Sequence, residues 1–238
     1  MADTLLEISG LEAGYGDVQV LWDVSLQVQA GAITCIVGSN GAGKTTLLRT
    51  ISGLIRPRAG SIRLAGTEIG GAAPDEVLAA GVVHVPEGRR LFKGLSVRDN
   101  LMLGAYLRKD KAQVARDLDF VMETFPILRE RSGQDATTLS GGEQQMCAIG
   151  RGIMSAPRLL MIDELSLGLA PRLVEVLSEA LTEVNRTGLS ILLVEQDVLT
   201  ALDLASEGFV IETGRVTITG PSADLARDAR IREAYMGL

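Results

Sequence analysis

The segment that most constrains this chain is a glycine-rich run that reads Gly38-Ser39-Asn40-Gly41-Ala42-Gly43-Lys44-Thr45-Thr46. It satisfies the phosphate-binding pattern G-x-x-x-x-G-K-[ST] at every position. Residues 32–37, just before it, form a short apolar run rich in β-branched side chains and predict a buried strand, whereas residues 46–51 have helical spacing. A strand, a glycine loop and a helix in this order predict that the chain binds a nucleoside triphosphate. A glycine-rich turn that closes a strand–helix unit without a ligand is the alternative.

Each residue type in this loop has a physical role. Glycines let successive backbone N–H groups converge on phosphate oxygens without a Cβ in the way, and the N-terminus of the following helix adds partial positive charge. We expect the Lys44 ammonium to reach the β- and γ-phosphates, and the Thr45 hydroxyl to complete a Mg²⁺ shell made mostly of water and phosphate. The residues expected to bind the nucleotide here are Gly38, Ser39, Asn40, Gly41, Ala42, Gly43, Lys44, Thr45 and Thr46.

The second half of the chain supplies two neighbouring carboxylates, which narrows the choice among the kinases, GTPases and transport ATPases that the loop alone leaves open. Residues 159–162 are apolar and lead directly into Asp163 and Glu164. Such a run is typical of a buried parallel strand that delivers acids to a site at its C-terminal edge. We expect Asp163 to hold Mg²⁺ through water, and Glu164 to act as the general base that polarises the attacking water. Taken alone, the pair is equally consistent with a helix N-cap whose charges are solvated.

A third motif, Leu139-Ser140-Gly141-Gly142-Glu143-Gln144-Gln145, opens a stretch with helical spacing over residues 146–154. It resembles the signature sequence of the ATP-binding cassette (ABC) family. A Ser-Gly-Gly turn at a helix start is physically a second anion-binding nest, although Ser140 as a simple helix cap is the alternative. The resemblance implies that Ser140, Gly141 and Gly142 face the γ-phosphate of an ATP held by a second subunit. It therefore implies a dimer, in which Lys44 of one chain and Ser140 of the other sandwich each ATP.

Further family positions match residue by residue over most of the chain. Tyr15 occupies the position of an aromatic residue that stacks on adenine in the family. Glu87 follows a predicted strand, residues 82–85, where similar cassettes place a glutamine that senses Mg²⁺ and the γ-phosphate; a glutamate can still ligate Mg²⁺. Gln196 follows the predicted strand 190–195 and stands where most cassettes carry a switch histidine. The candidate catalytic residues are therefore Glu164, Lys44 and Gln196.

Departures from the family pattern lead to expectations about rate and coupling. The Gln196 amide can donate a hydrogen bond to phosphate but cannot become cationic near neutral pH, so we expect slower hydrolysis than in a histidine-bearing cassette. The single histidine of the chain, His84, lies in a different predicted strand and is expected to be packed there. Residues 166–171 resemble the loop that touches the partner subunit. Because Leu165 and Ala170 replace the commonest family residues beside and within this loop, we expect weaker or differently arranged coupling between subunits.

Four short runs narrow the resemblance to one branch of the family. They are Val-Pro-Glu-Gly-Arg-Arg at 85–90, Ser-Leu-Gly-Leu-Ala-Pro at 166–171, Val-Glu-Gln-Asp at 194–197 and Tyr-Met-Gly at 235–237. They are similar to importer cassettes for high-affinity uptake of branched-chain amino acids, in particular the shorter of the two ATP-binding subunits; relatives that import urea and short amides are the alternative. The resemblance implies a peripheral protein on the cytoplasmic face of the inner membrane. Its implied partners are a second cassette, identical or not, two permease subunits and, indirectly, an extracytoplasmic solute-binding protein.

Composition agrees with this interpretation. In 238 residues with a net charge of -7, no dense basic run provides the surface that a nucleic-acid binder needs, so no nucleic-acid partner is expected. No apolar stretch approaches the ~20 residues of a membrane-spanning helix, and residues 1–4 lack the start of a signal peptide. Cys35 and Cys147 fall in apolar segments and predict buried free thiols in a reducing compartment. Trp22 is assigned to the core.

Together these elements predict an α/β fold, a P-loop ATPase core of the ABC type with an N-terminal antiparallel β subdomain and an inserted α-helical subdomain. We expect one domain over residues 1–238, with the core at about 1–96 and 155–238 and the helical subdomain at about 97–154. The family resemblance implies a groove near residues 87–97 that receives a permease helix. Two other classes stay open: a soluble cassette ATPase that acts on DNA or the ribosome, and a module that binds nucleotide without hydrolysing it.

Overall fold

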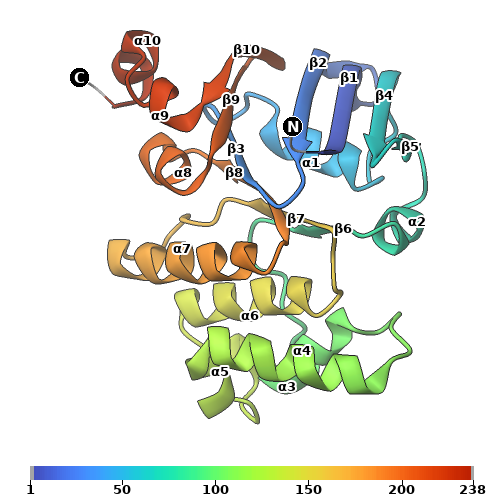
Figure 1. The fold of residues 1–238 in the computed structure, drawn as a ribbon, viewed down its shortest axis with the longest axis vertical. Helices are drawn as coiled ribbons and strands as arrows, with labels where there is room; N and C mark the ends of the chain where they lie inside the picture. Colours follow the sequence, from blue (N-terminus) through green and yellow to red (C-terminus); the bar gives the residue numbers. More distant parts are fainter. Residues whose placement is uncertain (1–2, 237–238) are drawn as a thin grey trace.

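The computed structural model, which describes residues 3–236, contains two β-sheets of different kinds (Figure 1). The strands are β1 (Thr4–Tyr15), β2 (Val18–Gln29), β3 (Ile33–Val37), β4 (Ala59–Leu64), β5 (Thr67–Glu68), β6 (Val82–Val85), β7 (Leu159–Asp163), β8 (Ser190–Glu195), β9 (Glu207–Glu212) and β10 (Arg215–Pro221). The helices are α1 (Lys44–Ile51), α2 (Pro74–Ala79), α3 (Val97–Gly104), α4 (Lys111–Thr124), α5 (Pro126–Glu130), α6 (Gly141–Ile153), α7 (Pro171–Arg186), α8 (Val198–Leu204), α9 (Ser222–Leu225) and α10 (Ala229–Ile231). A 3-10 turn lies at Ala136–Thr138 and a π-helical turn at Arg232–Met236.

The larger sheet runs in the order β10-β9-β3-β8-β7-β6, and every neighbouring pair from β9 to β6 is parallel. Side chains alternate between two hydrophobic cores, so that Cys35 and Val37 of β3 point into one core and Ile36 points into the other. A strand buried on both faces must be apolar at successive positions, which is why these strands are visible in the sequence. Because the strands are parallel, β3, β7 and β8 end at the same edge, and the predicted site residues follow them there.

The smaller sheet, in the order β2-β1-β4-β5, is antiparallel. Its long hairpin turns at Gly16, whose φ of 52° lies in the left-handed region that glycine adopts without strain. Ile8 of β1 lies opposite Leu26 of β2, and both belong to a core that also holds Leu47 and Leu48 of α1. This core includes side chains of both sheets, so the antiparallel subdomain is packed onto the larger sheet through α1. The N-terminal antiparallel β subdomain predicted from the sequence is confirmed.

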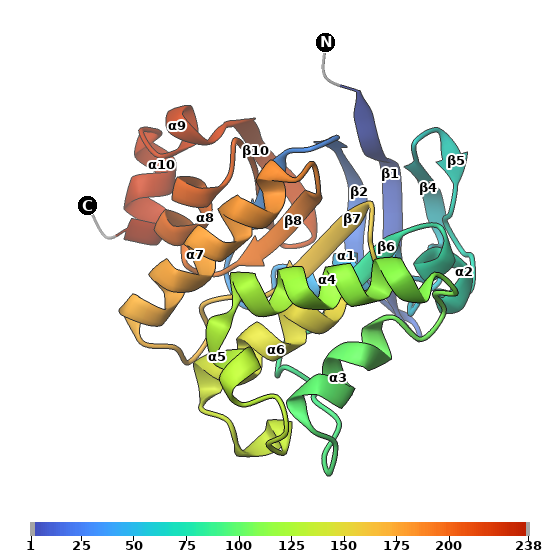
Figure 2. The same ribbon diagram turned by 60° about the horizontal axis from the view of Figure 1, so that its bottom comes forward.

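Helices α3 to α6 gather in the lower part of Figure 1, and Figure 2 shows the same group from below. Their apolar side chains, among them Leu101, Leu118 and Ile149, belong to the core that contains Cys35 and Val37 of β3. This core lies on the face of the larger sheet opposite to α1, and side chains of α7 and α8 pack into it as well. Helices α3 and α6 approach closely at Gly104, where a Cβ would clash with the carbonyl oxygen of Arg151. The predicted fold class, an α/β P-loop core with an antiparallel β part and an inserted helical part, is confirmed.

The two cysteines behave as predicted, because both are buried and free. Burial raises the pKa of the Cys35 thiol to about 12 and that of Cys147 to about 11, so neither is reactive at neutral pH. The assignment of Trp22 to the core was wrong. Its indole is 41% exposed, because Leu21 and Val24 are the buried residues of this part of β2, and the Arg215 guanidinium lies 5.8 Å from its ring centroid.

Within residues 3–236, no helix combines the length and the apolar character needed to cross a bilayer. The predicted domain also includes residues 1–2 and 237–238, which lie outside the described part of the chain. Gly237 of the Tyr-Met-Gly run lies there too.

Candidate active site

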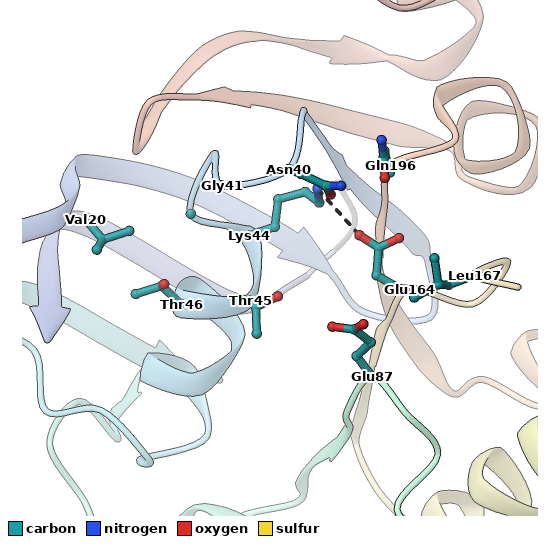
Figure 3. Close-up of a pocket in the computed structure, with 11 residues that line it drawn as sticks. Val20, Asn40, Gly41, Lys44, Thr45, Thr46, Glu87, Glu164, Leu167 and Gln196 are labelled. Atoms are coloured by element: carbon teal, nitrogen blue, oxygen red, sulfur yellow. Dashed lines mark ion pairs between the residues drawn. The ribbon is translucent and has the colours of Figure 1, made fainter.

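The glycine-rich loop joins β3 to α1 and curves over the N-terminus of that helix (Figure 3). Gly38 follows β3 directly, and a Cβ there would clash with the carbonyl oxygen of Ile211 on β9. Gly43 precedes α1 with a φ of 107°, a left-handed conformation that other residues rarely adopt. The loop therefore requires glycine at these positions, and it brings backbone groups close to the positive end of α1, as an anion site needs.

Lys44 is the first residue of α1 and only 5% exposed. Its Nζ donates hydrogen bonds to the carbonyl oxygens of Gly38 (2.7 Å) and Ser39 (3.3 Å), and it lies 3.5 Å from Oε1 of Glu164 (Figure 3). A buried ammonium is costly unless oxygens of opposite charge or dipole surround it, and these three groups do so. The lysine is thus fixed in one position beside the acid that the sequence predicts as the general base.

Asp163 is 1% exposed at the end of β7, and its Oδ1 accepts a hydrogen bond from the Thr45 hydroxyl at 3.3 Å. Burial raises the pKa of this carboxyl to about 6; the Thr45 hydrogen bond opposes the rise, and the nearby charges of Glu164 and Glu87 add to it. Its Oδ2 is buried and has no hydrogen-bond partner among the described residues. A buried carboxylate oxygen without a partner, near two further acids, is electrostatically suited to a cation.

The oxygen atoms of Thr45 and Asp163 fit a Mg²⁺ ion that phosphate oxygens help to hold. No group of three or more His, Cys, Asp or Glu side chains within residues 3–236 forms a metal cage from protein alone. Mg²⁺ does not require one, since it keeps several waters and usually takes one or two protein oxygens together with substrate phosphates. The Thr45 hydroxyl and the free oxygen of Asp163 are oxygen donors of this kind.

One cavity of about 560 Å³ collects residues from distant parts of the chain. It is lined by Val20, Asn40, Gly41, Gly43, Lys44, Thr45, Thr46, Glu87, Glu164, Leu167 and Gln196. Loop and α1 residues form one side, whereas Glu87, Glu164 and Gln196 come from the segments that follow β6, β7 and β8 (Figure 3). The structure thus brings the predicted phosphate loop, base and switch position together around one space.

Other predicted residues lie close to this cavity without lining it. Gly38 and Ser39 act through the carbonyl groups that hold Lys44, and Ala42 is buried in the same loop. Asp163 lines a second cavity of about 160 Å³, which shares Thr45 and Glu87 with the first.

Ser140 caps helix α6, as the simpler interpretation of the third motif proposed. Its Oγ accepts a hydrogen bond from the backbone N–H of Glu143 at 3.4 Å, and Oε2 of Glu143 accepts one from the N–H of Ser140 at 2.7 Å. A cap does not exclude an anion site, because this arrangement leaves other N–H groups of the first turn available. Ser140, Gly141 and Gly142 do not line the cavity that contains Lys44. Within a single chain, the glycine-rich loop at residues 38–46 and the Ser140-Gly141-Gly142 turn therefore lie at different places.

Tyr15 ends β1 with its side chain 45% exposed. Its hydroxyl oxygen accepts hydrogen bonds from Nη1 of Arg49 at 3.2 Å and from Oγ1 of Thr46 at 3.5 Å. The ring does not line the cavity. Stacking of Tyr15 on adenine stays a prediction.

Glu195, a fully buried acid at the end of β8, is not among the site residues predicted from the sequence. Burial raises its pKa to about 7, against hydrogen bonds from Ser166 that favour the ionised form. A signal was present, because an apolar run that ends in an acid is the same pattern that identified Asp163 on the neighbouring strand.

His84 is packed in β6 between the buried residues Val83 and Val85. Burial, with a smaller effect of the positive charge of Arg49, lowers the pKa of its imidazole to about 4. Its Nε2 is buried without a hydrogen-bond partner among the described residues. The imidazole is therefore neutral at pH 7 and cannot supply the positive charge of a switch histidine.

This depressed pKa predicts a loss of stability in acid. The unfolded imidazole binds a proton below pH 6.5 and the folded one only near pH 4, so the native state is destabilised as pH falls through that window. We expect His84→Gln to gain about 3 kcal/mol in free energy of unfolding relative to the parent chain between pH 7 and pH 4. Denaturant unfolding at each pH measures this. A difference between the two proteins that is independent of pH would contradict it.

Comparison with known proteins agrees with the geometry. Residues 21–166 match the family described as "ABC transporter". The Pseudomonas aeruginosa protein named "High-affinity branched-chain amino acid transport ATP-binding protein BraG" is 43% identical over 234 residues, covering 98% of this chain and 100% of BraG. An Archaeoglobus fulgidus protein named "Probable branched-chain amino acid transport ATP-binding protein LivF" is 34% identical over 235 residues, with 98% and 99% covered. The fold matches the solved ADP conformation of MJ1267, an ATP-binding cassette of an ABC transporter, with a TM-score of 0.86 at 22% identity and 99% of each chain covered. The chain belongs to the ABC transporter family, as one of its ATP-binding and ATP-hydrolysing subunits.

Proposed function

We propose that this chain hydrolyses ATP to drive the import of branched-chain amino acids through a membrane permease. The main support is the near full-length similarity to BraG, a protein named for branched-chain amino acid transport. The cavity that places Lys44, Glu164 and Gln196 around one space supports the ATPase part of the proposal. An importer of urea or short amides is the alternative, since a cassette does not contact the transported solute.

In this proposal the loop residues 38–46 hold the triphosphate, with Lys44 on the β- and γ-phosphates. Thr45, Asp163 and Glu87 would hold Mg²⁺, which would supply positive charge that neutralises the phosphate oxygens. The unpartnered Oδ2 of Asp163 is the observation that favours a cation at this point. Tyr15 is proposed to stack on adenine after its ring turns toward the cavity.

Glu164 is proposed to accept the proton of the attacking water. In the structure it lies 3.5 Å from Nζ of Lys44, so the two side chains pair with each other. A bound phosphate would pair with the Lys44 ammonium in place of Glu164. The Glu164 carboxylate would then be free to orient a water molecule. Gln196, exposed at the cavity, is placed to donate an amide hydrogen bond to the γ-phosphate.

We propose that a second cassette completes each site. Ser140, Gly141 and Gly142 lie away from the cavity of their own chain, so their anion-binding nest is available to a nucleotide on another subunit. A longer, non-identical cassette is the proposed partner, and pairing with a second copy is the alternative.

A groove of about 700 Å³ next to the inserted helices is proposed as the permease contact. It includes the exposed side chains of Phe92, Tyr106 and Leu107, and it lies between β6 and the helices α3 and α6. We propose that residues 97–154 form a helical subdomain on a core of residues 1–96 and 155–238. In this proposal the groove receives one helix of a permease subunit, on the cytoplasmic face of the inner membrane. A solute-binding protein delivers the amino acid from the other side of the membrane.

Reconstitution tests the proposed function. The chain is coexpressed with the second cassette, the two permeases and the binding protein that we expect to be encoded beside it, and the purified complex is placed in liposomes. We expect ATP-dependent uptake of leucine, isoleucine or valine and ATPase activity that rises with loaded binding protein. Uptake of urea or a short amide instead would replace the proposed solute. Purification with nucleic acid or ribosomes and without permeases would overturn the transport function.

The glutamine at position 196 gives a prediction about rate. We expect Gln196→His to raise single-turnover hydrolysis by up to about tenfold, equivalent to ~1.4 kcal/mol of barrier, because an imidazolium donates a stronger hydrogen bond to phosphate than an amide. Rapid-quench measurement of phosphate release at saturating ATP detects the change. Gln196→Asn, which keeps the amide but shortens the side chain, is the control and should not gain rate. If the histidine variant is no faster than the parent, the hypothesis of slow hydrolysis through Gln196 is wrong.

A further inference from the structure

The buried carboxylate of Glu195 accepts two hydrogen bonds from one residue, Ser166. Oε1 accepts from the backbone N–H of Ser166 at 2.8 Å, and Oε2 accepts from the Ser166 hydroxyl at 2.9 Å. Glu195 is 0% exposed, and taking a carboxylate out of water is costly unless its hydrogen bonds are made. The Glu195 carboxylate therefore fixes Ser166 at the end of β8, because each of its two oxygens accepts a hydrogen bond from Ser166.

The segment attached in this way begins with the proposed base. Glu164 has a φ of 57°, a left-handed conformation that costs of order 1 kcal/mol or more in a non-glycine residue and persists only where the surroundings impose it. Its N–H donates to the carbonyl oxygen of Val194 at 2.9 Å, and the next side chain, Leu165, is 0% exposed. Three successive residues are thus held: Glu164 by β8, Leu165 by the core and Ser166 by Glu195.

The residues next to the Glu195–Ser166 pair in the sequence line the cavity. Gln196, the next residue, lines the cavity from the end of β8, and Leu167, the residue after Ser166, lines it as well. Glu195 itself does not line the cavity, so it has no direct contact with a bound nucleotide there. It can influence hydrolysis through the residues whose backbone it fixes and through its charge close to Glu164, and replacing it by the uncharged glutamine separates these two effects.

We propose that Glu195 is a positioning residue, which holds Ser166 so that the Glu164 carboxylate keeps its orientation toward the cavity and a fixed relation to Gln196. The inference rests on the proposed role of Glu164 as the base. This positioning role requires a side chain at position 195 that accepts the Ser166 N–H and is a hydrogen-bond partner for the Ser166 hydroxyl. A glutamine supplies both, because its carbonyl oxygen accepts and its NH₂ donates to the hydroxyl oxygen. An apolar side chain of similar size supplies neither.

Glu195→Leu and Glu195→Gln, made in the full chain within the assembled transporter, test the proposal. We expect Glu195→Leu to lower kcat between about tenfold and 100-fold, as a misplaced catalytic group does, with the KM for ATP changed less than twofold. Glu195→Gln should stay within about threefold of the parent kcat. Glu212→Leu, which removes an exposed carboxylate at the end of strand β9 in the same sheet, is the matched control and should leave kcat unchanged. A parent-like kcat in Glu195→Leu, or an equal loss in Glu195→Gln, would overturn the inference.

Combination with Glu164→Gln separates positioning from general structural damage. If Glu195 acts through Glu164, Glu195→Leu lowers single-turnover hydrolysis in the parent but causes no further loss in Glu164→Gln. Independent, multiplying losses would contradict the proposal. If Glu195→Leu does not fold, Ser166→Ala removes only the hydroxyl hydrogen bond, and we expect a smaller loss of kcat with the same lack of additivity. If Glu164→Gln alone leaves turnover unchanged, the assignment of the base fails, which is a different result from a failure of the positioning role.

Discussion

Replacing Glu164 by glutamine is expected to lower ATP turnover by about 100- to 10,000-fold, the usual contribution of a general base. The amide has the size of the carboxylate but cannot accept the proton of the attacking water. ATP binding should persist or become tighter, because the substitution removes a negative charge that lies 3.5 Å from the Lys44 ammonium and faces the same cavity as the triphosphate. Lys44 keeps its hydrogen bonds to Gly38 and Ser39. Steady-state phosphate release by the assembled transporter and titration with a fluorescent ATP analogue measure the two effects.

Glu175→Gln is the matched control for this substitution, since Glu175 is an exposed glutamate on α7 outside the cavity. It should behave like the parent in both measurements. Unchanged turnover in Glu164→Gln would show that Glu164 is not the base and that hydrolysis resides elsewhere in the complex. Loss of ATP binding together with turnover would show that the carboxylate supports the fold of the loop and not the chemistry.

Lys44→Ala is expected to weaken ATP binding by at least about tenfold to 100-fold, from the loss of charge-assisted hydrogen bonds worth roughly 1.5–3 kcal/mol. The change removes the buried cation and leaves the Glu164 carboxylate unpaired opposite the phosphates, so repulsion adds to the lost attraction. Turnover at accessible ATP concentrations falls with binding. Titration with the same fluorescent analogue gives the dissociation constant, and denaturant unfolding reports whether the loop still folds.

Two substitutions define what Lys44 contributes. Lys44→Arg keeps the charge, but a planar guanidinium does not fit between the carbonyl oxygens of Gly38 and Ser39, so it should rescue binding poorly. Lys93→Ala, at an exposed lysine outside the cavity, should leave binding unchanged. Full binding by Lys44→Arg would mean that charge alone, without the compact ammonium, is sufficient.

Some of the structure could be predicted because it is local in sequence. The strand β3, the glycine loop and α1 follow one another directly, and β7 leads straight into Asp163 and Glu164. Positions whose environment depends on distant segments were predicted less well. Trp22 was placed in the core by its hydrophobicity, yet the alternation of β2 points it outward.

The sequence by itself determined the chemistry available to this protein. A glycine-rich phosphate loop, a strand that ends in two acids and a capped Ser-Gly-Gly turn are short segments whose conformation follows from local steric and hydrogen-bonding preferences. Only the tertiary structure decided which of these groups meet. Parallel pairing of β7 with β8 sets Asp163 beside Val194, and this register, imposed by packing of both sheet faces, brings Glu164 and Ser166 to Val194 and Glu195. The same packing leaves Ser140 outside the Lys44 cavity, although both lie in motifs that the sequence displays equally clearly.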